Sequence, residues 1–210
     1  MVIKEKHIID FCKGITWFIV LGLISYFNQW NNLTAWIYLI LHGSYGLMWV
    51  MKSQIFPDKT WEKPVKFSYG ILIFVGLCAY WTPAYIITSE SHMASIPILF
   101  GAIICFIFGV WYHFVSDMQK FTFLKYHKGL IKDGLWSHCR HPNYFGEFLI
   151  YFSFVLMSIE AVMWWIPVVI LNIFIAFVWY PNMRRIEQSL SRFDDHEDYK
   201  KQTSFFFPFL

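Results

Sequence analysis

The chain has 210 residues, of which 57% are hydrophobic and only 15% are charged, and its mean hydropathy is +0.45. A soluble domain of this length needs more charge to cover its surface, so the composition excludes an ordinary soluble protein and indicates a membrane protein with one domain. The net charge of +3 is too small to predict a nucleic-acid partner.

Six apolar runs, taken in chain order, are long enough or nearly long enough to cross a bilayer as helices. They cover residues 11–27, 33–51, 67–88, 96–116, 147–162 and 163–182. The last two runs lie close together around Glu160 and predict a tight helical hairpin. The sequence therefore predicts an all-α bundle of about six transmembrane helices that is embedded in a lipid bilayer.

Lysine and arginine occur in alternate connections between these runs. All 17 lie in the N-terminal segment, in residues 51–66 and 117–146, or in the C-terminal tail. The connections near 28–32, 89–95 and 160 carry none. By the positive-inside rule, this alternation places both termini in the cytoplasm. An endoplasmic reticulum membrane in a eukaryote and an inner membrane in a bacterium both fit this pattern.

Three polar groups fall on the predicted cytoplasmic side. After the fourth run, His113, Asp117 and Lys120 have the spacing of one helix face. The second group is the stretch WSHCRHPNYFGEF at 136–148, and the third is the stretch MRRIEQSLSRFDDHEDYK at 183–200. Ionisable groups at membrane depth are costly, so they indicate function unless they anchor a helix end.

The middle group has the pattern of a ligand site at a helix start. Pro142 has no N–H and biases His141 away from helical geometry, so a helix is predicted to follow with Asn143 as its cap. Glu147 then lies near the positive end of the helix dipole. Free N–H groups at such a helix start suit an anionic or polar ligand.

Metal sites and nucleotide-binding motifs are not predicted. His138 and His141 are three residues apart without a clear third ligand, and the four cysteines show no C-x-x-C spacing. The chain also has no G-x-G-x-x-G stretch, so a Rossmann domain is not expected. Any dinucleotide would have to bind in a cavity between helices.

A family resemblance is carried by the stretch GLWSHCRHPNYFGEFL, which resembles the C-terminal signature of the steroid 5α-reductase-like membrane proteins, closest to a branch of short homologues. The resemblance covers about residues 110–210 and rests on the blocks SDMQK, GLW…RHPNYFGE and DYKKQTSFFFPF. The same superfamily contains sterol reductases and isoprenylcysteine carboxyl methyltransferases. Residues 96–210 are therefore expected to bind the cofactor, and residues 1–95 to form the substrate-side helices of a single domain.

The reductase resemblance implies NADPH held between the cytoplasmic ends of the last helices. By position, Asp117, Asn143 and Glu147 match the acid, amide and acid that bind the cofactor in the reductases. Arg184 and Tyr199 fall in the C-terminal block that contacts the cofactor. The other cofactor-side candidates in these segments are His113, Lys120, Arg140, His141 and Tyr144.

The N-terminal half has no match to the acid–tyrosine pair that polarises the substrate carbonyl in the 5α-reductases. The polar residues of the second run, Tyr38, His42 and Tyr45, are the alternative source. We expect Tyr45 and His42 to be catalytic, with a hydrogen bond to the developing enolate, although a packing role is the alternative for His42. The expected reaction is reduction of a polarised double bond, of the enone type, in a lipophilic substrate from the bilayer.

Two other functions stay open at this point. A methyltransferase using S-adenosylmethionine would resemble the second branch of the superfamily, and the tail offers Arg185 and Glu187, but Gln188 where that branch carries a second acid. Cations at the cytoplasmic end favour the phosphates of NADPH over a sulfonium ligand. A non-enzymatic membrane scaffold is the last alternative, and the gathering of polar groups at one end argues against it.

Overall fold

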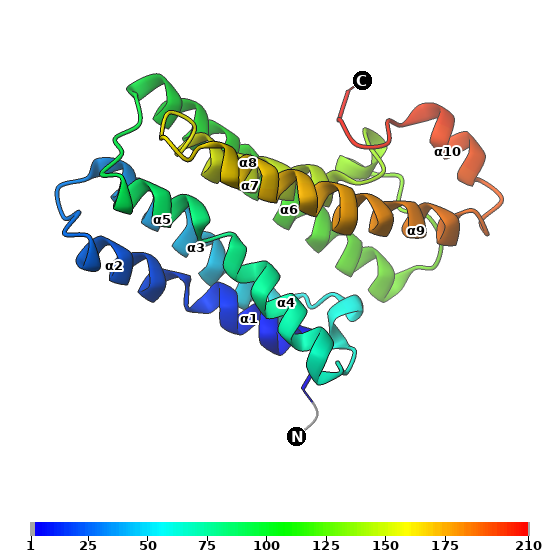
Figure 1. The fold of residues 1–210 in the computed structure, drawn as a ribbon. Helices are drawn as coiled ribbons and strands as arrows, with labels where there is room; N and C mark the ends of the chain where they lie inside the picture. The colour runs from blue at the N-terminus through cyan, green and yellow to red at the C-terminus, as the bar shows by residue number, and fades with distance from the viewer. Residues whose placement is uncertain (1–2, 210) are drawn as a thin grey trace.

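All regular secondary structure in the described part of the chain is helical. The computed structural model describes residues 3–209, where helices alternate with short connections and the β-structure is limited to two isolated bridges. Figure 1 shows the longer helices running side by side, with the connections gathered at the two ends of the bundle. The predicted all-α bundle is confirmed, whereas the side of the membrane that each end faces stays a prediction.

The first three spans lie in the N-terminal half and consist of five helices. They are α1 (Glu5–Gly14), α2 (Thr16–Tyr26), α3 (Leu33–Ile55), α4 (Phe67–Ala79) and α5 (Thr82–Ser89). Only Ile15 separates α1 from α2, and only Tyr80 and Trp81 separate α4 from α5, so each pair forms one bent span. α3 begins after Asn32, whose side-chain oxygen accepts a hydrogen bond from the backbone N–H of Ala35 at 3.1 Å.

The C-terminal half forms a second group of spans. Its members are α6 (Ile96–Tyr126), α7 (Pro142–Leu156), α8 (Trp165–Phe174), the π-helical segment η3 (Ile175–Trp179) and α9 (Tyr180–Leu190). The wide turns of η3 come just before Pro181, which has no N–H to donate, and they keep α8 and α9 in one continuous span. The short connections carry the 3-10 helices η1 (Lys59–Glu62) and η2 (Gly134–Ser137), and α10 (His196–Gln202) lies in the tail.

Five helical segments in the described chain are long and apolar enough to cross a membrane. α7 is a shorter sixth, because its 15 residues extend only about 22 Å. It begins at Pro142 and not at 147 as the apolar run suggested. Conversely, α6 continues to Tyr126, ten residues beyond the predicted end at 116. The apolar run ends at 116 because the last three turns of the helix carry polar side chains among the apolar ones.

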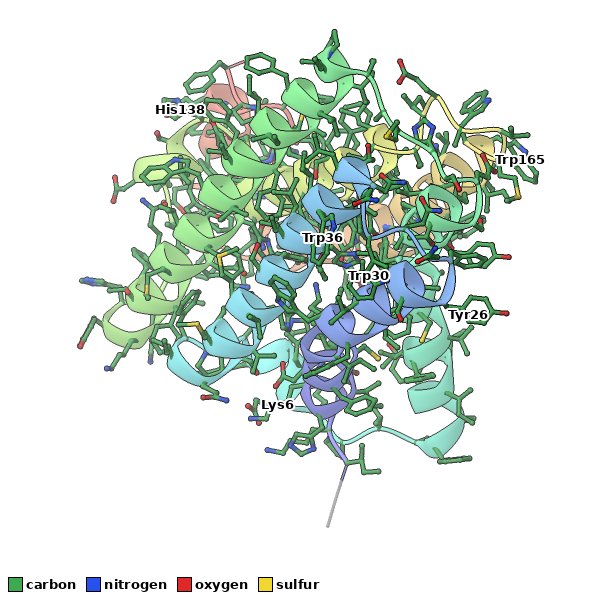
Figure 2. All side chains as sticks on the ribbon, turned by 90° about the vertical axis from the view of Figure 1, so that its left-hand side faces the viewer. Lys6, Tyr26, Trp30, Trp36, His138 and Trp165 are labelled. Carbon is green, nitrogen blue, oxygen red and sulfur yellow. The ribbon has the colours of Figure 1, made fainter. Side chains whose placement is uncertain are left out.

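The outer face of the bundle is apolar, as a lipid environment requires. Large exposed side chains occur along the spans, for example Phe18, Leu72, Ile107 and Phe177. Tyr26 and Trp165 project outward at the end where α2 meets α3 and α7 meets α8 (Figure 2), which is the usual place for an aromatic belt at a membrane surface.

Two glutamates cross-link the connections at this same end. The Glu90 carboxylate, just after α5, accepts hydrogen bonds from the backbone N–H groups of Val162 and Met163 at 2.7 and 3.1 Å. The Glu160 carboxylate accepts two from Ser95, the residue before α6, each at 2.8 Å. Charge-assisted bonds of this kind are about twice as strong as neutral ones, so the predicted hairpin between α7 and α8 is held to the α5–α6 connection.

Candidate functional site

The first polar cluster lies where α3, α6 and α7 meet. Asp117 is 7% exposed, and its Oδ2 pairs with the amino group of Lys52, which is 4% exposed. Its Oδ1 accepts a hydrogen bond from Nδ2 of Asn143 at 3.1 Å. Nδ1 of His113 lies 3.1 Å from the backbone oxygen of Asn143. Because a buried carboxylate is stable only when it is paired and hydrogen-bonded, this cluster fixes the three helices relative to one another.

Glycines bring the backbones of α6 and α7 close enough for this contact. A Cβ atom on Gly109 would lie 2.8 Å from the backbone nitrogen of Ile150 and 2.9 Å from the backbone oxygen of Gly146. On the other helix, a Cβ atom on Gly146 would collide with the backbone of His113. Small residues allow helices to approach in this way in membranes, where hydrophobic burial does not hold helices together. The close approach sets Asn143 opposite Asp117.

The second polar cluster surrounds Lys13, which is 6% exposed and lies at the end of α1. Its amino group donates hydrogen bonds to the hydroxyl oxygens of Tyr45 at 2.9 Å and Tyr151 at 3.1 Å. A Cβ atom on Gly46 would collide with the backbone oxygen of Lys13, so the glycine is what lets α1 lie directly against α3. A lysine that interrupts an apolar span is therefore enclosed by protein and not by lipid.

Trp49 connects the two clusters. The amino nitrogen of Lys13 lies 3.9 Å from the centroid of this ring, and that of Lys52 lies 4.3 Å from it. The ring also stacks on His113, with centroids 5.6 Å apart and planes at 14°. Cation–π contacts strengthen when they are shielded from water, so Trp49 stabilises both lysines at depth. Together the clusters form one polar chain from Tyr151 to Asn143.

Several polar groups along this chain have no partner within the protein. Nε2 of His113 and Oδ1 of Asn143 are buried and make no hydrogen bond among residues 3–209. Glu147, one turn after Asn143, is half-buried and forms no ion pair within the same residues. It lies within electrostatic range of Lys13 and Lys52. Buried polar groups are nearly always satisfied, so a polar ligand beside these atoms would complete their hydrogen bonding.

A small cleft opens beside the first cluster, between α1, α3 and η1. Trp49 and Lys52 form its inner wall, and Asp10, Asp58 and Trp61 lie toward the outside. Ion pairs hold η1 and its flanks over the cleft. They are Lys120–Asp58 at 2.7 Å, Lys4–Glu62 at 2.7 Å and Lys6–Glu62. Burial favours the neutral form of Asp58, but attraction and a hydrogen bond from Lys120 outweigh it and lower the pKa of this carboxyl to about 2.

A second small cleft lies between α5, α7 and α8. Its lining is almost entirely apolar, from Pro83 of α5, Val155 of α7 and Leu171 of α8. Tyr80 and Tyr151 also line it, with their rings stacked at a centroid distance of 3.9 Å. The cleft thus reaches the same tyrosine that binds Lys13.

A third cluster holds the C-terminal tail against the segment that precedes α7. Nε of Arg140 lies 3.1 Å from both carboxylate oxygens of Glu187, and its Nη1 donates to the backbone oxygen of Thr203 at 2.5 Å. The Tyr199 hydroxyl donates to the backbone oxygen of Trp136 at 2.7 Å. These side chains use their hydrogen bonds within the protein, so the cluster has the contacts of a structural clamp.

His141 belongs to this clamp as well. Its Nε2 lies 3.4 Å from Oε1 of Glu187, and its ring packs edge-on against Phe205. Burial lowers the pKa of His141, although the neighbouring Glu187 acts in the opposite direction. The motif at 136–148 therefore has two parts. Arg140 and His141 contact the C-terminal tail and α9, and Asn143 and Glu147 lie at the end of the polar chain.

The structure brings some of the predicted site residues together and separates others. His113, Asp117 and Asn143 meet in the first cluster, and Tyr45 joins the second. His42 instead shares a hydrogen bond with the Tyr38 hydroxyl at 2.8 Å, and its ring stacks on Phe154. These contacts are those of a packing residue. Tyr144 is half-buried at the edge of the hydrophobic core, and Arg184 is exposed on α9.

One local expectation is wrong. Asn143 does not cap α7: the helix begins at Pro142, the capping position is His141, and no side chain closes it. The side chain of Asn143 points to Asp117 because α6 lies so close. Asp117 and Lys120 lie on one face of α6 but do not pair with each other. Each has a partner from the α3–α4 region, Lys52 and Asp58 respectively.

Lys13, Lys52 and Tyr151 are not among the site residues predicted from the sequence. The positive-inside rule accounts for both lysines, because it applies equally to exposed and buried cations. A signal was present in the sequence, since Lys13 interrupts an otherwise apolar stretch in the first span. Tyr151 had no such signal, because an aromatic residue within an apolar helix is most often part of the core.

Comparison with known proteins places these features in a family. Residues 1–204 match the family described as "Protein of unknown function (DUF1295)", a steroid 5α-reductase-like family. No match was found among curated proteins or among solved structures. The match spans both polar clusters and both clefts. The chain therefore belongs to the DUF1295 family of membrane proteins.

Proposed function

We propose that the protein is a membrane reductase that uses NADPH to reduce a polarised double bond in a lipid. The observation that carries this proposal is the polar chain between Tyr151 and Asn143. It sets a lysine–tyrosine pair in the same polar chain as the buried Oδ1 of Asn143 and near the half-buried carboxylate of Glu147, neither of which has a hydrogen-bond partner among residues 3–209. Polar groups of this cost at membrane depth are expected where chemistry occurs.

The unpartnered acceptors fit the amide end of NADPH. Its carboxamide offers N–H donors, and Oδ1 of Asn143 and the carboxylate of Glu147 are acceptors without partners among residues 3–209. Its phosphates require cations. The adjoining cleft offers Lys6 and Lys52, which pair with Glu62 and Asp117 respectively and lie among the acids Asp10 and Asp58. Asp117 supports this arrangement because it fixes the side chain of Asn143 through a hydrogen bond.

The lysine–tyrosine pair fits the second half of the reaction. Reduction of a C=C bond adds one hydride and one proton, and NADPH supplies the hydride when it is bound. The hydroxyl of Tyr45 holds a proton, and the Lys13 amino group, 2.9 Å away, can replace that proton in its protonated form. A positive group at this position also stabilises the negative charge that develops on a carbonyl oxygen conjugated to the double bond.

Methyl transfer from S-adenosylmethionine is the second candidate and fits the cluster less well. Its sulfonium is cationic and favours acids and open aromatic faces. Here two lysine amino groups already lie over Trp49, and the carboxylate of Asp117 is paired with one of them. Glu187, the acid that resembles the methyltransferase tail, is engaged by Arg140.

Ligand-induced thermal stabilisation of the purified protein in detergent tests the proposal directly. A ligand that binds only the folded state raises the melting temperature. We expect NADPH to raise it, and S-adenosylmethionine to have no effect. Asn143→Ala and Glu147→Gln should each reduce the NADPH shift, whereas Asn172→Ala, an exposed amide that bonds to its own helix, should leave it unchanged. Stabilisation by S-adenosylmethionine alone would refute the proposal.

A further inference from the structure

The cleft beside the first cluster is covered by the connection between α3 and α4. Lys52 lies on its inner wall, and Trp61 and Glu62 of η1 line it from the outside. Pockets that hold cofactors typically enclose about 300–1,000 Å³, and the space left in this cleft is much smaller. A dinucleotide can therefore reach Lys52 from this side only after η1 has moved outward.

The connection is anchored on both sides of η1. Before it, Asp58 pairs with Lys120 of α6 at 2.7 Å. After it, residues 63–65 pair with residues 3–5 through two backbone hydrogen bonds of 3.1 and 3.0 Å. These contacts do not involve the side chains of η1. The short segment between the two anchors is therefore free to move once its own contacts are broken.

Glu62 makes the polar contacts that hold η1 itself. Its Oε2 lies 2.7 Å from the amino nitrogen of Lys4, and its Oε1 pairs with Lys6. Hydrogen bonds and attraction from both lysines lower the pKa of this carboxyl to about 2, so it is ionised at neutral pH. Two ammonium groups that converge on one carboxylate are equally able to bind the oxygens of a phosphate.

The ion pairs around the cleft differ in how readily a second anion can replace the carboxylate. The Lys52–Asp117 pair is almost fully buried, and breaking such a pair is costly. Asp58 is also more buried than Glu62. The side chains of Glu62 and its two lysines are between 28% and 38% exposed, and exposed pairs contribute little to stability. Glu62 is therefore the carboxylate that an incoming phosphate replaces most easily.

We propose that Glu62 is an internal competitor for the phosphates of the cofactor. In the ligand-free protein it holds η1 over the cleft, and a phosphate that binds Lys4 and Lys6 releases it. η1 then swings outward between its two anchors and uncovers Lys52. This inference rests on the proposed function and adds a gated entrance to the NADPH site. The chemistry that is recognised is a phosphate between two ammonium groups.

Substitutions at the two ends of one ion pair test this competition. Glu62→Gln frees both lysines and should tighten NADPH binding to the full chain roughly fivefold, the effect expected for two exposed ion pairs. Lys6→Met removes one of the cations and should weaken binding by a similar factor. A purely structural pair would shift the affinity in the same direction from both ends. Thermal stabilisation against NADPH concentration, in a maltoside detergent that carries no phosphate, measures these affinities.

A matched control excludes an effect of net charge alone. Lys132 and Asp195 form an exposed pair that does not line the cleft. Asp195→Asn removes the same charge as Glu62→Gln and also frees a lysine, but it should leave the NADPH affinity unchanged. If Asp195→Asn tightens NADPH binding as much as Glu62→Gln does, the inference fails.

Hydrogen exchange of the ligand-free proteins gives an independent readout. Glu62→Gln should speed the exchange of the amides of residues 60–62, because their segment has lost its ion pairs. The amides of residues 63–65 should keep their protection, since their backbone pairing with residues 3–5 is unchanged. Unchanged exchange at residues 60–62 would show that Glu62 does not hold η1 closed, and it would overturn the inference.

Inorganic pyrophosphate separates this inference from the proposed function, because it lacks a nicotinamide. It should stabilise Glu62→Gln more than the wild type. If it does so and NADPH stabilises neither protein, the competition stands and the reductase proposal fails. If NADPH stabilises both proteins equally, the reductase proposal stands and the competition is wrong. Stronger stabilisation of Glu62→Gln by phosphatidic acid than by pyrophosphate would assign the lysines to a lipid headgroup and overturn the inference.

Discussion

Nδ2 of Asn143 donates a hydrogen bond to Oδ1 of Asp117 across 3.1 Å, and this contact joins the start of α7 to the middle of α6. The other oxygen of Asp117 is held by Lys52 from α3. One buried carboxylate therefore connects the N-terminal half of the chain, which carries Lys13 and Tyr45, to the C-terminal half, which carries the unpartnered acceptors.

Replacing this carboxylate should strongly destabilise the protein. Asp117→Ala leaves the amino group of Lys52 buried without a counter-charge, and breaking a buried pair from one side costs about 3–5 kcal/mol. Lys52→Met with Asp117→Leu should recover part of the loss, because neither charge then remains. Denaturation in detergent measures both, and a double variant no more stable than Asp117→Ala would contradict this account.

The approach of α6 and α7 gives a prediction that needs no ligand. Gly109→Ala places a methyl group 2.8 Å from the backbone nitrogen of Ile150, and we expect it to cost about 1–3 kcal/mol. Gly101→Ala on the same helix meets no atom within 4 Å and should be neutral or mildly stabilising. Equal melting temperatures for the two variants would show that the helices separate at no cost.

Substitutions at Tyr45 and at His42 distinguish a catalytic role from a packing role for these two residues of α3. Tyr45→Phe removes the hydroxyl that Lys13 contacts, and it should lower the rate of NADPH-dependent reduction of the conjugated double bond by about 100-fold or more. Stabilisation by NADPH should persist in this variant. His42→Leu should instead lower stability with a smaller effect on rate, since His42 stacks on Phe154. Steady-state kinetics and melting curves of both proteins test the contrast.

Acid should weaken the α3–α4 connection through Asp58. Burial opposes ionisation of this carboxyl, but Lys120 lowers its pKa to about 2 in the folded state, below the usual value near 4. A depressed folded-state pKa stabilises the protein above pH 4, and this contribution, about 2 kcal/mol, is lost as the pH falls from 4 toward 2. The stability gap between wild type and Asp58→Asn should therefore close over that range. A constant gap would argue against the pair.

The clamp on the C-terminal tail should be visible by hydrogen exchange. Glu187→Gln weakens the hold on Arg140, which in turn bonds the backbone of Thr203. We expect amides of α10 and of residues 203–206 to exchange faster, while those of α6 keep their protection. Arg192→Gln, at an exposed position just after α9, is the control. Unchanged exchange in the tail would mean that other contacts hold it.

The positions of the spans and of one polar helix face can be predicted from the sequence, whereas the residue pairs between helices cannot. Apolar runs define where a chain can cross a membrane, and the spacing of His113 and Asp117 follows from helix geometry alone. The partner of Asp117 lies 65 residues away on another helix. That pairing depends on close contacts such as the one at Gly109 and Gly146, which no linear pattern encodes.

The same limit explains why neighbouring residues of the motif before α7 contact different parts of the protein. Arg140, His141 and Asn143 are neighbours in the chain, yet the break at Pro142 turns their side chains in different directions. Position in a motif therefore suggested one common role for all three. Their actual contacts depend on which other segment each side chain faces.

The reciprocal bonds of Glu90 and Glu160 tie neighbouring connections together through backbone amides at one end of the bundle, in exposed positions. At the opposite end, lysine–carboxylate pairs secure η1, and among them Lys120–Asp58 is more buried than Lys4–Glu62. Exposed ion pairs are individually weak and sensitive to salt. Raising the ionic strength should therefore loosen the Lys4–Glu62 contact before the Lys120–Asp58 contact.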